Sequence, residues 1–279
     1  MPPTQPKRAP FPSAPQAALL LLAGFMFQYF LGAAFYDFRQ FLGLTYEQGA
    51  TIGMLLSNGI LISVVMHILR VGYPDLLHPS KTSAVTTFLF LAPPILLLLP
   101  LIVLLDIALI WALEAIFPLS SWEHAAFAGM VAPTLPAFIA TCLIAPVVEE
   151  MLFRGILLKA FLERYPRGLA ISYSALYFGA AHLNIYQFFL AFLLGLLLGW
   201  LYERARSLVP CIVLHGALNT TVVVWSASKD STATQDPFMV PALAWLAAAI
   251  AAAVGAIALR RLLSRPWTSL LSNVKHSND

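Results

Sequence analysis

Charged residues are scarce in this chain. They make up 10% of its 279 residues, whereas hydrophobic residues make up 60%. Soluble domains carry roughly 25% charged residues, so this composition excludes an ordinary soluble domain and indicates an integral membrane protein. Cysteine is scarce too: Cys142 and Cys211 are the two present. Two thiols exclude a disulfide framework and a four-cysteine metal site, and in apolar segments such as these cysteine usually packs as a small hydrophobe.

Two further patterns are missing from the sequence. It shows no internal repeat and no interrupted helix pair of the kind that marks secondary transporters. The motif HExxH, by which zincins place two histidines on one helix, is also absent.

Long apolar runs, in contrast, are abundant. About 20 apolar residues are needed to cross the hydrocarbon of a bilayer. We therefore predict an all-α polytopic membrane protein with about eight transmembrane helices around a polar cavity. The third predicted span is long and contains three prolines, so it is expected as one kinked span or as two short segments. The predicted spans are residues 17–36, 49–69, 84–117, 135–162, 168–183, 186–203, 208–226 and 238–260.

These spans divide the chain into five regions, with residues 117–134 expected as an interfacial loop. The regions are a disordered cytoplasmic tail (1–16), N-terminal transmembrane helices (17–129), a core that carries the polar motifs (130–226), a last loop and helix (227–263) and a cytoplasmic tail (264–279).

The basic residues predict the orientation in the membrane. With eight spans, 13 of the 16 Lys and Arg residues fall on the side of both termini, and the positive-inside rule makes that side cytoplasmic. Arg39 and Lys229 fall on the other side, and Arg154 lies within a span. The 13 are Lys7, Arg8, Arg70, Lys81, Lys159, Arg164, Arg167, Arg204, Arg206, Arg260, Arg261, Arg265 and Lys275.

Three ionisable side chains interrupt the fourth span. Glu149, Glu150 and Arg154 lie where a single charge costs from about 3 to more than 10 kcal/mol. Residues four apart share one face of a helix, so Glu150 and Arg154 are expected to form an ion pair. Glu149 then projects about 100° away and is free to act as a general base. A purely structural cluster is the weaker hypothesis, because one arginine cannot neutralise two carboxylates.

Two more polar pairs lie in later spans. Phe178 precedes His182 by four residues, and His215 precedes Asn219 by the same interval. Each could be an ordinary hydrogen-bonded group. A histidine and an asparagine on one helix face can also orient water and donate hydrogen bonds to a developing oxyanion, as amide hydrolysis requires.

In this order the three clusters resemble the EExxxR, FxxxH and HxxxN motifs of the CAAX-protease and bacteriocin-processing family, also called the abortive-infection family. Its members are glutamate-type intramembrane endopeptidases and include the prenyl-protein (CAAX) proteases. The resemblance covers roughly residues 130–225. It implies an all-helical core around a cavity that opens toward the cytosol.

The resemblance also implies roles for the motif residues. Glu149 and His182 would activate a water molecule for attack on a peptide carbonyl. His215 and Asn219 would complete the site, with Asn219 as the oxyanion donor. Glu150, Arg154 and Phe178 would be supporting residues. No acyl-enzyme and no cofactor are expected.

Three alternatives stay open at this point. Glutamate and two histidines could bind zinc in a metalloprotease. The protein could be a non-catalytic membrane scaffold or a bacteriocin-immunity protein. It could also be a proton-coupled transporter that uses Glu149 or Asp106, an acid within the third predicted span.

The expected partners are the lipid bilayer and a membrane-associated peptide or protein, prenylated or not, with no nucleic acid. The sequence leaves the oligomeric state open. A prokaryotic plasma membrane is the expected location.

Overall fold

The computed structural model describes residues 10–130, 134–227 and 237–264. Within these ranges every regular element is helical and no strand occurs, which confirms the predicted all-α class. Seven helical segments among the described residues are long and apolar enough to cross a membrane. The chain is therefore a multi-pass membrane protein.

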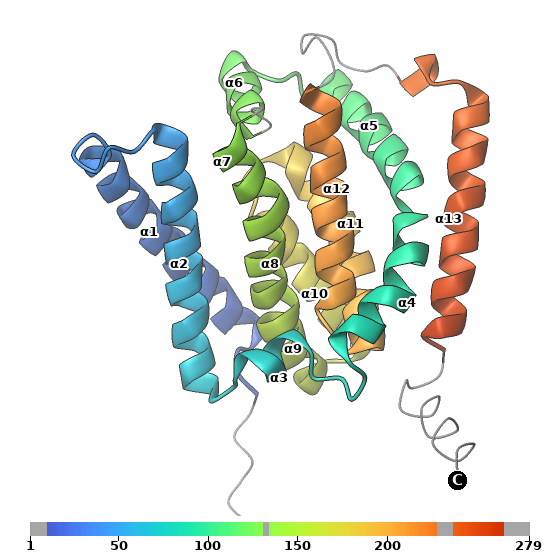
Figure 1. Ribbon diagram of the computed structural model, residues 1–279, viewed down its shortest axis with the longest axis horizontal. Coiled ribbons are helices and arrows are strands. Elements are labelled where there is room, and N and C mark those ends of the chain that lie inside the picture. Colours follow the sequence, from blue (N-terminus) through green and yellow to red (C-terminus); the bar gives the residue numbers. More distant parts are fainter. Residues whose placement is uncertain (1–9, 131–133, 228–236, 265–279) are drawn as a thin grey trace, which may run out of the picture.

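The helices form a central group with one helical layer on each flank (Figure 1). One flank is the hairpin of α1 (Ala14–Phe38) and α2 (Tyr46–Leu69). The other flank consists of α4 (Ala84–Leu96), α5 (Leu99–Ile116) and α13 (Ala242–Leu262). Between the flanks lie the continuous helix 135–164, α10 (Arg167–Ala180), α11 (Ile185–Ala205) and α12 (Val209–Ala227). This central group carries all three polar motifs.

The first helix begins earlier than predicted. Ser13 and Gln16 form a capping box at its N-terminus, so α1 starts at Ala14 within the predicted tail. Of that predicted tail, residues 1–9 lie outside the described residues. So do residues 228–236 of the last loop and residues 265–279 of the C-terminal tail.

Prolines divide the third predicted span into two helices. α4 contains Pro93 and Pro94 and ends at Leu96, and α5 begins at Leu99 with Pro100 in its first turn. Proline lacks an N–H and clashes with the carbonyl four residues before it, so one regular helix cannot continue through this stretch. Of the two predicted alternatives, the structure has the two segments end to end.

Two other segments differ from the prediction. The predicted span 168–183 forms α10, whose 14 residues extend about 21 Å, less than the roughly 30 Å of the hydrocarbon. It ends because Leu183 adopts a positive φ of 57° and the Asn184 side chain caps the next helix.

The expected loop 117–134 contains α6 (Ser121–Met130). A capping box of Ser120 and Glu123 starts α6, and this signal was readable in the sequence.

Candidate active site

The fourth span bears the acidic motif and is not a regular α-helix. Two π-helical stretches, Ile139–Ile144 and Met151–Leu158, flank the short helix α8 (Ala145–Glu150). Pro146 follows the first π stretch and cannot donate the hydrogen bond that a regular helix requires there. Such π turns occur mostly as single-turn bulges and often at functional sites. Glu149 and Glu150 therefore lie between two widened turns.

The first π stretch, Ile139–Ile144, packs closely against α12. A Cβ added to Gly216 would lie 3.2 Å from the carbonyl oxygen of Cys142, so glycine allows close contact here. One residue earlier in the π stretch, the Thr141 carbonyl accepts a hydrogen bond from Asn219 Nδ2 at 2.8 Å. His215 precedes the glycine directly. This contact thus fixes both members of the third motif against the helix that carries the first.

Glu150 is the centre of a fully buried ion cluster. Its Oε1 accepts hydrogen bonds from Arg154 Nη1 at 2.8 Å and from His215 Nδ1 at 2.9 Å. Glu150 and Arg154 are completely buried. Arg154 Nη2 also reaches the carbonyl oxygen of Gly195 on α11, at 3.4 Å. The predicted ion pair is present, and it also holds the imidazole of His215.

Glu149 has different surroundings from its neighbour. Its side chain is 30% exposed, and Oε2 lies 3.8 Å from Nε2 of His215. This oxygen is buried, and none of the described residues forms a hydrogen bond with it. Buried acceptors are nearly always bonded, and an exception in a native protein often marks a functional group. The Glu149 carboxylate can therefore accept a hydrogen bond from a ligand, and its exposure makes it the more accessible of the two acids, since Glu150 has an unbonded buried oxygen as well.

The ring of Phe178 connects the second motif to this cluster. Its face lies 4.3 Å from the Arg154 guanidinium carbon. The His182 and His215 rings meet it edge-on, with centroids at 5.3 and 5.6 Å. His182 Nδ1 donates to the carbonyl oxygen of Phe178 at 2.9 Å, which leaves Nε2 as the acceptor in the neutral ring. One aromatic side chain therefore contacts both predicted imidazoles and the arginine.

The structure thus connects six of the seven predicted site residues, either directly or through Phe178, whereas Asn219 bonds to the Thr141 carbonyl one helical turn after His215. Sequence reasoning missed two backbone carbonyls, those of Thr141 and Gly195. Gly195 had a partial signal, since its spacing from Gly199 is typical of close helix packing. Among the described residues, no group of three or more His, Cys, Asp or Glu side chains is arranged to hold a metal ion.

Together, the fold and this site define a polytopic helical membrane protein with a buried cluster of acids, imidazoles, a guanidinium and a carboxamide. Residues 131–221 match the family model described as type II CAAX prenyl endopeptidase Rce1-like. The match confirms the predicted resemblance for that segment, about a third of the chain, and indicates a CAAX-type intramembrane protease at the level of the family. No curated protein and no solved structure shows significant similarity to the chain.

Proposed function

We propose that this protein is a glutamate-type intramembrane endopeptidase that hydrolyses a peptide bond of a membrane-associated substrate with an activated water molecule. The observation that carries the proposal is the difference between the two adjacent carboxylates. Glu150 is completely buried, neutralised by Arg154 and bonded to His215, whereas Glu149 is 30% exposed and forms no ion pair with an arginine or lysine of the described chain. One acid holds the site together, and the other is available for chemistry.

In this mechanism Glu149 takes a proton from water as the oxygen attacks the scissile carbonyl. His182, with its Nδ1 held by a backbone carbonyl, presents Nε2 to the same water. His215 lies beside Glu149 and stabilises the proton there, because Glu150 fixes its ring from the opposite side. The proton then passes to the leaving amine.

Asn219 is the proposed donor to the oxyanion. A carboxamide has two N–H groups, and the Thr141 carbonyl accepts from Nδ2 through one of them. This bond orients the amide so that the second N–H can face the tetrahedral intermediate. Removal of one such donor typically lowers kcat by 10² to 10³.

The test compares Glu149→Gln with the wild type, both purified in detergent. Loss of a general base lowers a rate by about 10² to 10⁴, so cleavage of membrane peptides should fall by at least about 100-fold in Glu149→Gln. The matched control is Glu163→Gln, since Glu163 is an exposed acid at the other end of the same long helix. This control should cleave at the wild-type rate.

The products should be identified by mass spectrometry of the membrane peptides cut. Comparing the cleavage of peptides that have a prenylated C-terminus with that of their unprenylated counterparts then shows whether the substrate must be prenylated. Cleavage by Glu149→Gln at the wild-type rate would contradict the proposal. Absence of cleavage by the wild type itself would favour a scaffold or immunity protein in which the polar cluster only sets the packing.

A further inference from the structure

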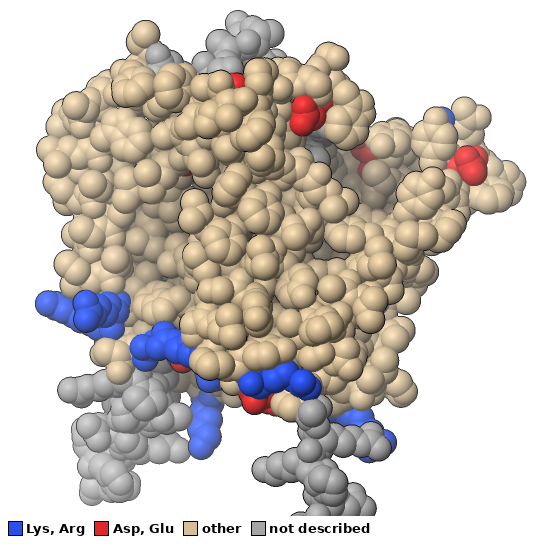
Figure 2. Space-filling view, turned by 180° about the vertical axis from the view of Figure 1, so that it is seen from behind, with Lys and Arg blue, Asp and Glu red and all other residues tan. Residues whose placement is uncertain are grey.

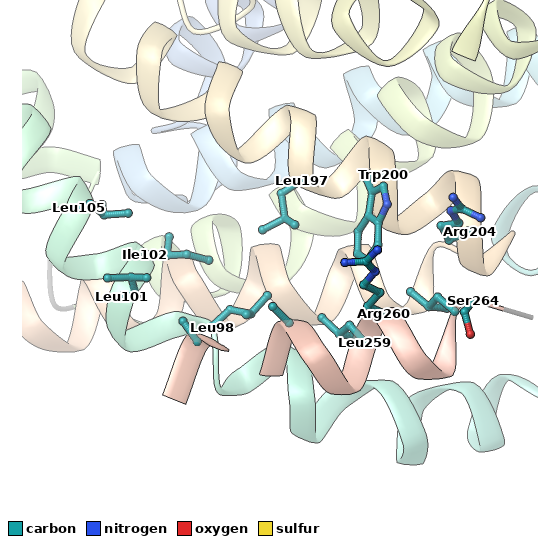
Figure 3. Close-up of a pocket in the computed structure, with 13 residues that line it drawn as sticks. Leu98, Leu101, Ile102, Leu105, Leu197, Trp200, Arg204, Leu259, Arg260 and Ser264 are labelled. Atoms are coloured by element: carbon teal, nitrogen blue, oxygen red, sulfur yellow. The ribbon is translucent and has the colours of Figure 1, made fainter. Parts of the chain in front are cut away.

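An apolar groove lies on the flank of the molecule, between α5, α11 and α13 (Figure 3). Its volume is about 590 Å³, and it shares no residue with the candidate active site. Leu197 and Trp200 line it from α11, two and five residues after Gly195. Because Leu197 follows Gly195 by about 200° around the helix, α11 has the ion cluster on one side and the groove on the other.

The walls of the groove are aliphatic, but one end is basic. Leu101 and Ile102 line it from α5, and Leu98 lines it from the position just before this helix. Arg260 lies beside Trp200, and Arg204 lies further along, at the end of the lining that also holds Ser264 (Figure 3). This is the end of the bundle where α13 terminates and where Figure 2 shows the Lys and Arg side chains gathered. A long apolar surface with cations at one end matches an amphiphile rather than a water-soluble ligand.

The charges at this end are not cancelled within the protein. Glu203 is shared between two arginines, Arg167 at 2.9 Å and Arg204 at 3.4 Å. No acidic side chain in the described part of the chain pairs with Arg260, which is exposed. A net positive charge therefore remains at the mouth of the groove, next to the hydroxyl of Ser264.

The depth of the groove corresponds to one leaflet. Its lining on α13 runs from Ala252 to Arg260, about 12 Å along the helix, and continues through Leu263 and Ser264 just beyond the end of the helix. Half of the hydrocarbon thickness is about 15 Å. A chain that enters at the basic end and follows the groove would thus reach the middle of the bilayer.

From these observations we infer that the groove binds a phospholipid with an anionic headgroup, its acyl chain along α13 and its phosphate on Arg204 and Arg260. Basic pockets between helices on the cytoplasmic side are typical sites for acidic lipid headgroups. A zwitterionic lipid would bring its own cation next to the arginines and leave their net charge in place, and a free anion would leave the apolar walls without a partner. The inference does not depend on the proposed protease activity.

The test is a lipid titration of the full chain in detergent by native mass spectrometry, with phosphatidylglycerol and phosphatidylcholine of equal acyl chains. The wild type should bind phosphatidylglycerol in preference, at one site. In the double variant Arg204→Gln and Arg260→Gln, affinity should fall about 30-fold, since each arginine near a lipid surface contributes roughly a fivefold factor.

The matched control is the double variant Arg206→Gln and Arg261→Gln. It removes the same charge at neighbouring positions outside the groove lining, and it should retain the site. A second variant, Ala256→Phe, keeps the charges and fills the groove, and it should lose the bound lipid. Equal binding of both lipids, an equal loss in the control, or wild-type binding by Ala256→Phe would each overturn the inference.

Discussion

At the scale of single residues, Arg154 allows the Glu150 carboxylate to be buried completely, because it neutralises this charge and has several partners of its own. Its guanidinium bonds to Glu150 and to the carbonyl oxygen of Gly195, and its face lies on the ring of Phe178. An arginine fork suits this position because it can serve several partners at fixed angles and also stack on an aromatic ring. A lysine could not make the same set of contacts.

Replacement of Arg154 by methionine should therefore be severely destabilising. It leaves the Glu150 carboxylate buried without its cation, and breaking a buried pair in this way costs about 3 to 5 kcal/mol. The midpoint of chemical unfolding in detergent measures the loss.

The double variant Glu150→Gln with Arg154→Met removes both charges. It should recover most of that stability, because the remaining amide can still accept from His215 Nδ1. If the double variant is as unstable as Arg154→Met alone, the ion pair does not account for the effect.

Helix spacing predicted one side-chain pair of the site, whereas its contacts between helices and its backbone partners were not predicted. The spacing of Glu150 and Arg154 predicted their contact, because helix geometry fixes which side chains share a face. The contacts of His215 with Glu149 and Glu150 depend on how two distant helices pack, and the family resemblance implied only that His215 completes the site. The Thr141 carbonyl had no sequence signal, because a π turn is not encoded by any single residue type.

At the scale of helices, the hairpin of α10 and α11 determines the position of His182. Gly179 allows the two helices to approach, since a Cβ there would lie 2.8 Å from the backbone oxygen of Phe188. Its own carbonyl accepts the backbone N–H of His182. A shift of this pair of helices would thus move the imidazole.

Gly179→Ala should lower both stability and activity. Overpacking against backbone costs about 1 to 3 kcal/mol, and displacement of His182 should reduce kcat more than it changes KM. The control is Gly168→Ala in the first turn of the same helix, where an added Cβ meets nothing within 4 Å. That variant should be stabilised by about 0.5 to 1 kcal/mol, because alanine favours helix. Equal effects of the two substitutions would show that the close approach at Gly179 is unimportant.

The helix pattern itself was largely predictable from hydropathy, because each long apolar run had to become a helix. Hydropathy did not predict where a helix stops inside an apolar stretch. α10 ends at Ala180 because of the turn that follows it, although the predicted span continues to residue 183. The prolines predicted an interruption of the helix between α4 and α5. They did not decide whether this interruption would be a kink in one helix or a break between two helices.

At the scale of the whole molecule, charge is distributed along the axis that would be normal to the membrane. α1 begins and α13 ends at the same end of the bundle (Figure 1), and the Lys and Arg side chains visible in Figure 2 lie along that end almost without exception. Arg39, at the opposite end of α1, is such an exception. With this arrangement, the positive-inside rule predicts that the basic end of the bundle faces the cytoplasm.

Cysteine labelling tests this orientation directly. Cys142 and Cys211 are buried, so the background reaction of the folded protein with a membrane-impermeant maleimide should be low. Gln40→Cys places an exposed thiol at the end of α1 opposite the basic residues, and Lys81→Cys places one at the basic end. In intact cells, Gln40→Cys should react at once and Lys81→Cys only after the membrane is permeabilised. Inverted vesicles should give the reverse order. Labelling of Lys81→Cys from outside intact cells would reverse the topology, and it would place the lipid groove between α5, α11 and α13 in the outer leaflet.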